Sequence, residues 1–357
     1  MGKKEQVHAG GKRKKVILIV AVILLVVLFV TCAIFYNELK IILSIQRIDA
    51  GRPIYTMQVD GDYHFEEFLK SGGASSDQGV SAFLTKKISK GFYSVDVEEP
   101  GPACSVLSAG TSEGRHLWGR NFDWTGSVPI LVKCIPQNGY ASISTCDFQN
   151  ITASAEAVPE GIANKMLAIA ALYVPMDGIN EAGLCVADLE VNEGGMVTVD
   201  TERPDLTITT AIRLLLNRAA TVDEAVELLR QYDIHASGGI SHHLAISDAD
   251  GKSVSVEFAD GEMAVVDTNV LTNFNLANGD LDAGGESAKE RYELLRSIDL
   301  ESQGILTKEQ IREALSQVSQ SKGEWTTQWS IVYEQDTLSA NYYFDGDYAN
   351  PFPFSIP

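Results

Sequence analysis

A cysteine followed within twenty residues by an arginine and an aspartate is the first arrangement in this sequence that could do chemistry. Cys104 is followed by Arg120 and Asp123, and residues 105–108 and 116–120 read as short strands joined by a glycine-containing turn. If the two strands pair as a hairpin, Arg120 and Asp123 return to the neighbourhood of Cys104. A cation near sulfur favours the nucleophilic thiolate, and a carboxylate can hold an adjacent ammonium group. The spacing therefore indicates a cysteine nucleophile.

The rest of the chain must supply the elements that position this hairpin. Two capping-box pairs, Thr221 with Glu224 and Thr307 with Gln310, mark helix starts. Periodicity predicts helices and strands in further segments: helices at 79–90, 207–219, 225–232 and 311–318, and strands at 183–191, 243–247, 253–258, 263–268 and 270–272. Strands, then helices, then strands favour a layered α+β domain over a βαβ repeat.

Four short motifs resemble those of one family. Residues 119–124 read Gly-Arg-Asn-Phe-Asp-Trp, which is similar to the Gly-Arg-Asn-x-Asp-Trp of N-terminal-nucleophile hydrolases of the choloylglycine hydrolase and penicillin acylase group. Acid ceramidase-like amidases are relatives of that group. Three further motifs follow in the family's order: Asp-Gly-Ile-Asn-Glu-Ala-Gly-Leu at 177–184, Leu-Thr-Asn at 271–273 and Glu-Arg-Tyr at 290–292. The resemblance covers roughly residues 104–357.

The resemblance implies an αββα four-layer sandwich, with two antiparallel sheets between helical layers. It also implies that Cys104 becomes the N-terminal nucleophile after the chain cuts the Ala103–Cys104 bond itself. Asn273 resembles the family's side-chain oxyanion donor, and Arg291 the second active-site arginine. Bile salt hydrolases place an asparagine where Glu190 stands, whereas the ceramidase-like relatives resemble this chain in having a glutamate. The resemblance therefore argues against bile salt specificity.

Such a site needs no separate base, because the free α-amine of an N-terminal residue has an ordinary pKa near 7.7–8.0. We expect hydrolysis of a linear, non-peptide amide C–N bond in a small N-acyl substrate through a thioester on Cys104, without a cofactor. Two alternatives stay open: acyl transfer from the same thioester, and a catalytically silent binding module at the cell surface. Bile salts, N-acyl amines, acyl homoserine lactones and penicillins are not distinguished, because loop side chains decide the pocket.

Each of these residues also has an ordinary structural explanation. A single cysteine is often a buried core residue, an arginine and an aspartate can form a surface pair, and an asparagine can cap a turn. A Cys–His protease is a further alternative that would use His116, His242 or His243, but no protease signature surrounds Cys104. We expect His242 and His243 to be structural. The order and spacing of the four motifs together favour the catalytic interpretation.

The five cysteines show no Cys-x-x-Cys pair and no Cys/His cluster at metal spacing, so no metal site is predicted. Cys134 and Cys146 both lie in strand-like segments. They could form a disulfide in an oxidising compartment or simply be small buried residues.

The N-terminal part of the chain predicts a membrane anchor. Residues 16–36 are uncharged and long enough to span a bilayer, and residues 1–15 are basic, which places them on the cytoplasmic side. A cleaved signal peptide is the alternative, although the apolar run is long for one. Residues 37–103 are then extracytoplasmic: a connector runs to about residue 60, and a pro-segment follows it. Residues 104–357 form the hydrolase domain. The net charge of −20 argues against nucleic acid as a partner.

Overall fold

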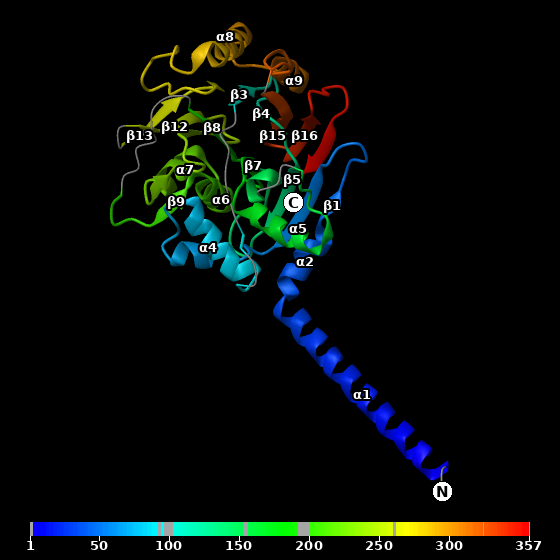
Figure 1. The fold of residues 1–357 in the computed structure, drawn as a ribbon. Coiled ribbons are helices and arrows are strands. Elements are labelled where there is room, and N and C mark those ends of the chain that lie inside the picture. Colours follow the sequence, from blue (N-terminus) through cyan, green and yellow to red (C-terminus); the bar gives the residue numbers. More distant parts are fainter. Residues whose placement is uncertain are drawn as a thin grey trace.

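The computed structural model describes residues 3–91, 94–95, 103–152, 156–191, 200–259, 262–323 and 325–356. Helix α1 (Lys3–Ile34) extends away from the body of the protein (Figure 1). Within it, Lys14–Ile34 is long and apolar enough to cross a membrane, a property that a signal sequence near an N-terminus shares. Phe35 alone separates α1 from the next helix, α2 (Tyr36–Ser44), which packs on the body.

Two sheets form the body within the described residues. The larger sheet has the strand order β1 (Gln46–Arg47), β2 (Tyr55–Asp60), β5 (Pro129–Ile135), β6 (Ser142–Asp147), β7 (Asp177–Asn180), β8 (Cys185–Glu190), β11 (His242–Ser247), β12 (Ser253–Ala259) and β13 (Glu262–Asp267). The smaller sheet has the order β14 (Val270–Leu271), β3 (Ala103–Gly110), β4 (His116–Trp124), β15 (Thr326–Glu334), β16 (Ser339–Phe344) and β17 (Phe352–Ser355). A separate parallel pair joins β9 (Asp205–Thr207) and β10 (Asp233–His235).

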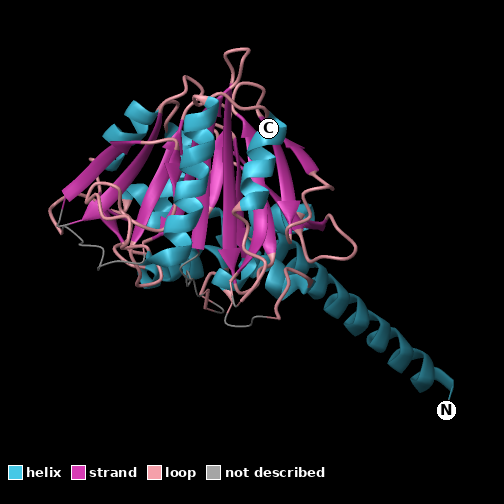
Figure 2. Ribbon diagram, turned by 90° about the horizontal axis from the view of Figure 1, so that it is seen from above, coloured by secondary structure: helices cyan, strands magenta, loops and turns pink. Residues whose placement is uncertain are grey.

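Helices cover the outer face of each sheet, as Figures 1 and 2 show. On the larger sheet lie α2, α3 (Phe65–Lys70), α4 (Asp77–Ile88), α5 (Gly161–Leu167), α6 (Ile208–Arg218), α7 (Val222–Leu229) and the 3₁₀ helices η1 (Phe148–Ile151) and η2 (Ala168–Leu172). On the smaller sheet lie α8 (Gly285–Ser302) and α9 (Lys308–Gln317).

The inner faces of the two sheets meet in a buried cluster. Strand residues alternate between the two sides of a sheet, so Leu117 faces α9 whereas Trp118 faces the opposite sheet. The larger sheet shows the same alternation at Val186 and Ala187. The result is the predicted order of layers: helices, sheet, sheet, helices.

The expectation that both sheets are antiparallel needs correction. Strands β2 and β5 pair in parallel, with Tyr55 opposite Ile130 and Asp60 opposite Ile135. Two parallel neighbours need a long crossover connection. Here the chain between them passes through α3, α4 and the β3–β4 hairpin of the other sheet before it returns.

Residues 37–60, which the sequence suggests are a connector, are part of the body instead. They form most of α2 together with β1 and β2, and β2 lies inside the nine-stranded sheet between β1 and β5. The helix expected at residues 79–90 is found as α4, Asp77–Ile88, and Ser76 caps its start. Alternating apolar residues in β2 explain its place, since Met57 and Val59 are buried against the helical layer.

Cys134 and Cys146 are buried and do not form a disulfide with each other. They lie on neighbouring strands, but Cys134 is opposite Ser142 and Cys146 is opposite Ile130. The register of β5 and β6 thus places them at different levels of the sheet, where both pack as small apolar residues.

Candidate active site

The β3–β4 hairpin brings Cys104 and Arg120 together. The register places Cys104 opposite Phe122 and Val106 opposite Arg120, so the thiol and the guanidinium lie diagonally on the same face, between the sheets. Arg120 Nη2 donates to Cys104 Sγ at 3.2 Å, and both side chains are fully buried. The expected return of Arg120 to the cysteine is therefore found.

Arg120 is held by the opposite sheet. Its Nη1 pairs with Asp177 Oδ2 on β7 at 2.7 Å and also donates to the carbonyl of Met176. Its Nη2 donates to the backbone oxygen of Asp188 on β8 at 2.9 Å and lies 3.5 Å from Oδ1 of the same residue. Burial lowers the pKa of Arg120, but the thiol and Asp177 raise it by more, so the side chain stays cationic.

A second group of contacts holds the backbone of the cysteine. Arg291 of α8 donates from Nη1 to the Cys104 carbonyl at 2.6 Å and from Nη2 to Asn273 Oδ1 at 2.9 Å. The same Asn273 oxygen accepts from the Cys104 N–H at 3.0 Å. Asn273 Nδ2 donates to the Glu190 carbonyl at 2.9 Å, which fixes the orientation of the amide. These contacts join residues 104, 190, 273 and 291 into one site.

Asp123 lies opposite Ala103, at the start of the hairpin. Its Oδ1 accepts from Thr327 Oγ1 at 2.5 Å and its Oδ2 from Gln320 Nε2 at 2.8 Å, while Arg291 Nη1 lies 3.7 Å away. Burial raises the pKa of this carboxyl, and Arg291 opposes that rise. Asp123 thus sits beside the bond that the sequence predicts to be cut.

The thiol itself is strongly perturbed. Burial raises the pKa of Cys104 to about 12; Arg120 acts in the opposite direction, and Asp188 adds to the rise. With Ala103 still attached, the sulfur is therefore protonated at neutral pH and needs a base close by. Glu190 contributes its backbone oxygen to the site; its half-buried carboxyl has a raised pKa because of burial.

Three further buried residues belong to this group although none of them is among the six predicted catalytic residues. Asp177 and Asp188 surround Arg120, and His242 of β11 lies against Asp188 at 3.2 Å. Asp177 begins the second family-like motif, which was the available signal. Asp188 carries no such signal, because it is a lone polar residue in a strand, and His242 was expected to be structural.

The histidines do not form a Cys–His pair in the part of the chain that the structure describes, where Arg120 is the side chain that donates to Sγ. His116 begins β4, opposite Gly110 at the far end of the hairpin, and contacts the Ala249 carbonyl. Burial lowers the pKa of His243 to about 3, so it is neutral.

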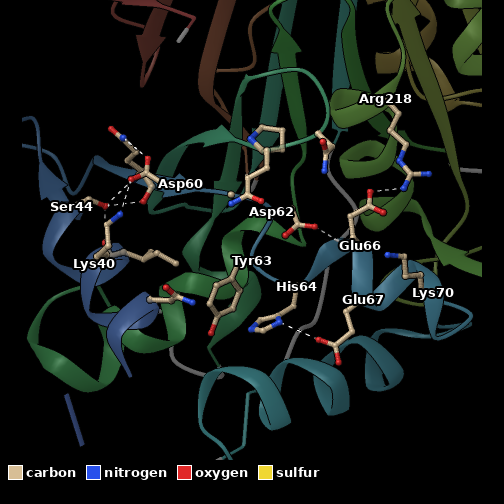
Figure 3. Close-up of a pocket in the computed structure, with 17 residues that line it drawn as sticks. Lys40, Ser44, Asp60, Asp62, Tyr63, His64, Glu66, Glu67, Lys70 and Arg218 are labelled. Carbon is tan, nitrogen blue, oxygen red and sulfur yellow. Dashed lines mark hydrogen bonds and ion pairs between the residues drawn. The ribbon is translucent and has the colours of Figure 1, made fainter. Parts of the chain in front are cut away.

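A large cavity lies elsewhere, between α2, α3 and the end of α6 (Figure 3). Its volume is about 1000 Å³, and charged side chains of both signs line it, among them the ion pairs Lys40–Asp60 and Arg218–Glu66. None of the six predicted catalytic residues lines it. Among the described residues, no group of three or more His, Cys, Asp or Glu side chains could hold a metal ion.

Comparison with known proteins supports the family resemblance. Residues 104–277 match the family model of linear amide C–N hydrolases, choloylglycine hydrolase family. A bile salt hydrolase/transferase from Clostridium perfringens is 30% identical over 184 residues, which are 48% of this chain and 53% of that protein. The chain thus matches about half the length of this relative.

Solved structures show the same fold. Two variants of conjugated bile acid hydrolase from Clostridium perfringens each match with a TM-score of 0.53 and 18% sequence identity. The match covers 71% of this chain and 92% of each of those chains. The chain therefore has a mixed α/β fold similar to that of these hydrolases, and the part that matches the family model begins at Cys104.

Proposed function

We propose that this chain, whose residues 104–277 carry the choloylglycine hydrolase family pattern, hydrolyses the linear amide bond of an N-acyl substrate with Cys104 as nucleophile. The observation that carries the proposal is the contact between Arg120 Nη2 and Cys104 Sγ at 3.2 Å. A buried cation next to a buried thiol favours the thiolate. Core packing alone does not require such a contact, whereas a cysteine nucleophile does.

The first step of the proposal is cleavage before Cys104. The sulfur attacks the carbonyl carbon of Ala103, the C–N bond to the Cys104 nitrogen breaks, and the thiol proton passes to that nitrogen. Water then hydrolyses the thioester, which regenerates the thiol and leaves a free α-amine. The contacts on both sides of Cys104 support this step, because Asn273 and Arg291 hold its N–H and its carbonyl in place.

The second part of the proposal is turnover of the substrate. The α-amine takes the thiol proton, the sulfur attacks the amide carbonyl, and Asn273 Nδ2 donates to the oxyanion. The protonated amine then gives its proton to the leaving nitrogen, and water clears the thioester. Asp123 holds the α-amine, because the carboxyl already lies opposite residue 103 in the hairpin. Arg120 stabilises the thiolate.

For the substrate, we propose an acyl chain joined to an amine or amino acid. The curated relative's name includes both hydrolase and transferase, which favours acyl transfer to an amine as the second candidate. Addition of amine acceptors separates the two, since a transferase forms a new amide where a hydrolase releases the free acid. The glutamate at position 190 supports a substrate other than a bile salt.

We further propose that α1 anchors the catalytic body on the outer side of the membrane, with residues 1–15 in the cytoplasm. The apolar length of Lys14–Ile34 and the basic residues before it support this orientation. Membrane fractionation and protease protection of the full chain test it.

N-terminal sequencing and intact mass of the full chain test the mechanism. Wild type should yield a fragment that starts at Cys104, whereas Cys104→Ala should stay intact and hydrolyse no amide substrate. Cys104→Ser keeps the shape of the side chain but removes the thiol, so it tests the nucleophile separately from the shape. Full amide hydrolysis by Cys104→Ala would contradict the mechanism; ligand binding without processing or turnover in wild type would favour a silent binding module.

A further inference from the structure

A buried histidine–aspartate pair lies directly behind the arginine that contacts the thiol. His242 Nδ1 is 3.2 Å from Asp188 Oδ2, and both side chains are fully buried. The other oxygen of the same carboxylate, Oδ1, lies 3.5 Å from Arg120 Nη2, which in turn donates to Cys104 Sγ. The pair therefore connects to the sulfur through a single side chain.

The surroundings of the imidazole fix how many protons the pair must hold. Nε2 of His242 lies 3.0 Å from the carbonyl oxygen of Ser237, which can only accept, and Nδ1 faces the Asp188 carboxylate. A neutral imidazole carries one N–H and can satisfy only one of two acceptors. The arrangement is satisfied when the pair holds one additional proton, either on His242 or on Asp188.

Counting charges around the sulfur shows why that proton matters. Two arginines, 120 and 291, face three buried carboxylates, 123, 177 and 188. With the additional proton, the cations balance the carboxylates; without it, one negative charge is in excess beside Cys104. Among the described residues, the titratable or charged groups around the sulfur and this pair come from both sheets and from one helix: Cys104 (β3), Arg120 and Asp123 (β4), Asp177 (β7), Glu190 (β8), His243 (β11) and Arg291 (α8).

We propose that His242 is a positioning residue that keeps a proton against Asp188 and thereby leaves the charge of Arg120 available to the Cys104 thiolate. The inference rests on the proposed function only in taking Cys104 as the nucleophile. The directions of the pKa shifts agree with it, because burial first and then Asp188 raise the pKa of the thiol, whereas Arg120 lowers it. A neutralised Asp188 removes one of the influences that oppose the thiolate; burial and Asp123 remain.

The variant His242→Asn separates the charge of the side chain from its shape. In His242→Asn the side-chain amide can still donate to Asp188, but it carries no proton that could neutralise the carboxylate. A like charge within a few ångströms shifts a pKa by roughly one to three units, so alkylation of Cys104 at a fixed pH should be about tenfold slower or more. Asp188→Asn/His242→Asn should recover most of the rate, because the excess negative charge is removed.

The measurement is the rate of reaction of Cys104 with iodoacetamide in the full chain, followed by mass spectrometry of the peptide that contains residue 104. Variants are compared in the same processing state, which N-terminal sequencing establishes. This readout needs no amide turnover, so a chain that hydrolyses none of the tested amides can still support or contradict the role of His242.

A second histidine–aspartate pair in the same chain provides the matched control. His235 Nε2 lies 2.6 Å from Asp205 Oδ1 in the separate β9–β10 pair, and His235 is largely buried. His235→Asn should leave the alkylation rate unchanged. A folded His242→Asn with the wild-type rate would overturn the proposal. If His242→Asn does not fold, Asp188→Asn decides: an unchanged rate supports the proposal, because Asp188 is already neutralised in wild type, whereas a faster rate, which would mean that Asp188 carries an uncompensated charge, or a slower rate contradicts it.

Discussion

Cys104 is surrounded by groups with opposite effects. Burial raises the pKa of its thiol to about 12, and Arg120 at 3.2 Å acts against that rise. An α-amine has an ordinary pKa near 7.7–8.0, so as ammonium it would place a second cation close to the sulfur. Cleavage before Cys104 would therefore supply both a base and a charge that favours the thiolate, which the intact chain lacks.

Asn273→Asp tests the side chain that we expect to stabilise the oxyanion. The change keeps the shape of the side chain but replaces the Nδ2 donor by an oxygen, which would also face the Glu190 carbonyl. Loss of one oxyanion donor typically lowers kcat about 10²–10³-fold. Steady-state kinetics of a variant that has been shown to be processed and folded should give this fall with a smaller change in KM. An unchanged kcat would remove Asn273 from the oxyanion site.

At this scale the sequence predicted the residues that belong to motifs. Arg120, Asn273 and Arg291 each form a hydrogen bond with Cys104. The partners of Arg120 on the opposite sheet, Asp177 and Asp188, were not predicted, because β4 belongs to one sheet and β7 and β8 to the other. The motif spacing indicates pairing within a hairpin, whereas contact between two stacked sheets depends on the packing of their inner faces.

Secondary-structure elements were predicted best where local chemistry marks their ends. Thr307 and Gln310 form the complete capping box at the start of α9. Thr221 accepts from the Glu224 N–H as expected, but the Glu224 carboxylate accepts from Ala220 N, one residue before the position that a capping box requires. The position of β2 could not be predicted, because a parallel pairing with β5 arises from the path of the chain and not from its local sequence.

A buried carboxyl at the end of β6 gives this part of the larger sheet a pH dependence. Asp147 Oδ1 accepts from the backbone N–H groups of Val128 and Gln149, and so joins the start of β5 to η1. Burial raises the pKa of Asp147 to about 6, above its ordinary value near 3.8. The folded chain therefore binds this proton more tightly than the unfolded chain does. The stabilisation from protonation is fully present below about pH 4 and is lost as the pH rises through about 6.

Asp147→Asn should remove that contribution, because an amide has no proton to lose. The free energy of unfolding of the variant relative to wild type should rise between about pH 4 and pH 7, by on the order of 2–3 kcal/mol at most. Thermal or urea unfolding at both pH values measures it. A difference that stays constant with pH would mean that Asp147 titrates normally in the folded chain.

At the scale of the whole molecule, the segment before Cys104 joins helix α1 to the two-sheet body. Strand β2 pairs with β5 along six residues, and fourteen apolar side chains of the segment are buried in the core on the outer side of the larger sheet: Ile41, Ile42, Ile45, Tyr55, Met57, Val59, Tyr63, Phe65, Phe68, Leu69, Val80, Leu84, Ile88 and Val95. At roughly 1.5–3 kcal/mol for a large buried apolar side chain, their gross contribution is on the order of 20 kcal/mol or more. Burial of this much apolar surface, together with the pairing of β2 and β5, favours continued association of the two fragments after a cut.

Cleavage before Cys104 should therefore leave the two fragments associated, with the catalytic fragment held at the membrane through α2 and α1. The test uses Cys104→Ala with a specific protease site inserted between Val95 and Ala103, so that the cut does not depend on the chain's own chemistry. After the cut, the fragment that contains residues 104–357 should stay in the membrane fraction and should be released only by denaturant. The uncut chain is the control, and release of the fragment in buffer alone would contradict the prediction. Because the N-terminal fragment supplies β2 and much of one helical layer, the released fragment should not regain its larger sheet after the denaturant is removed, which circular dichroism would detect.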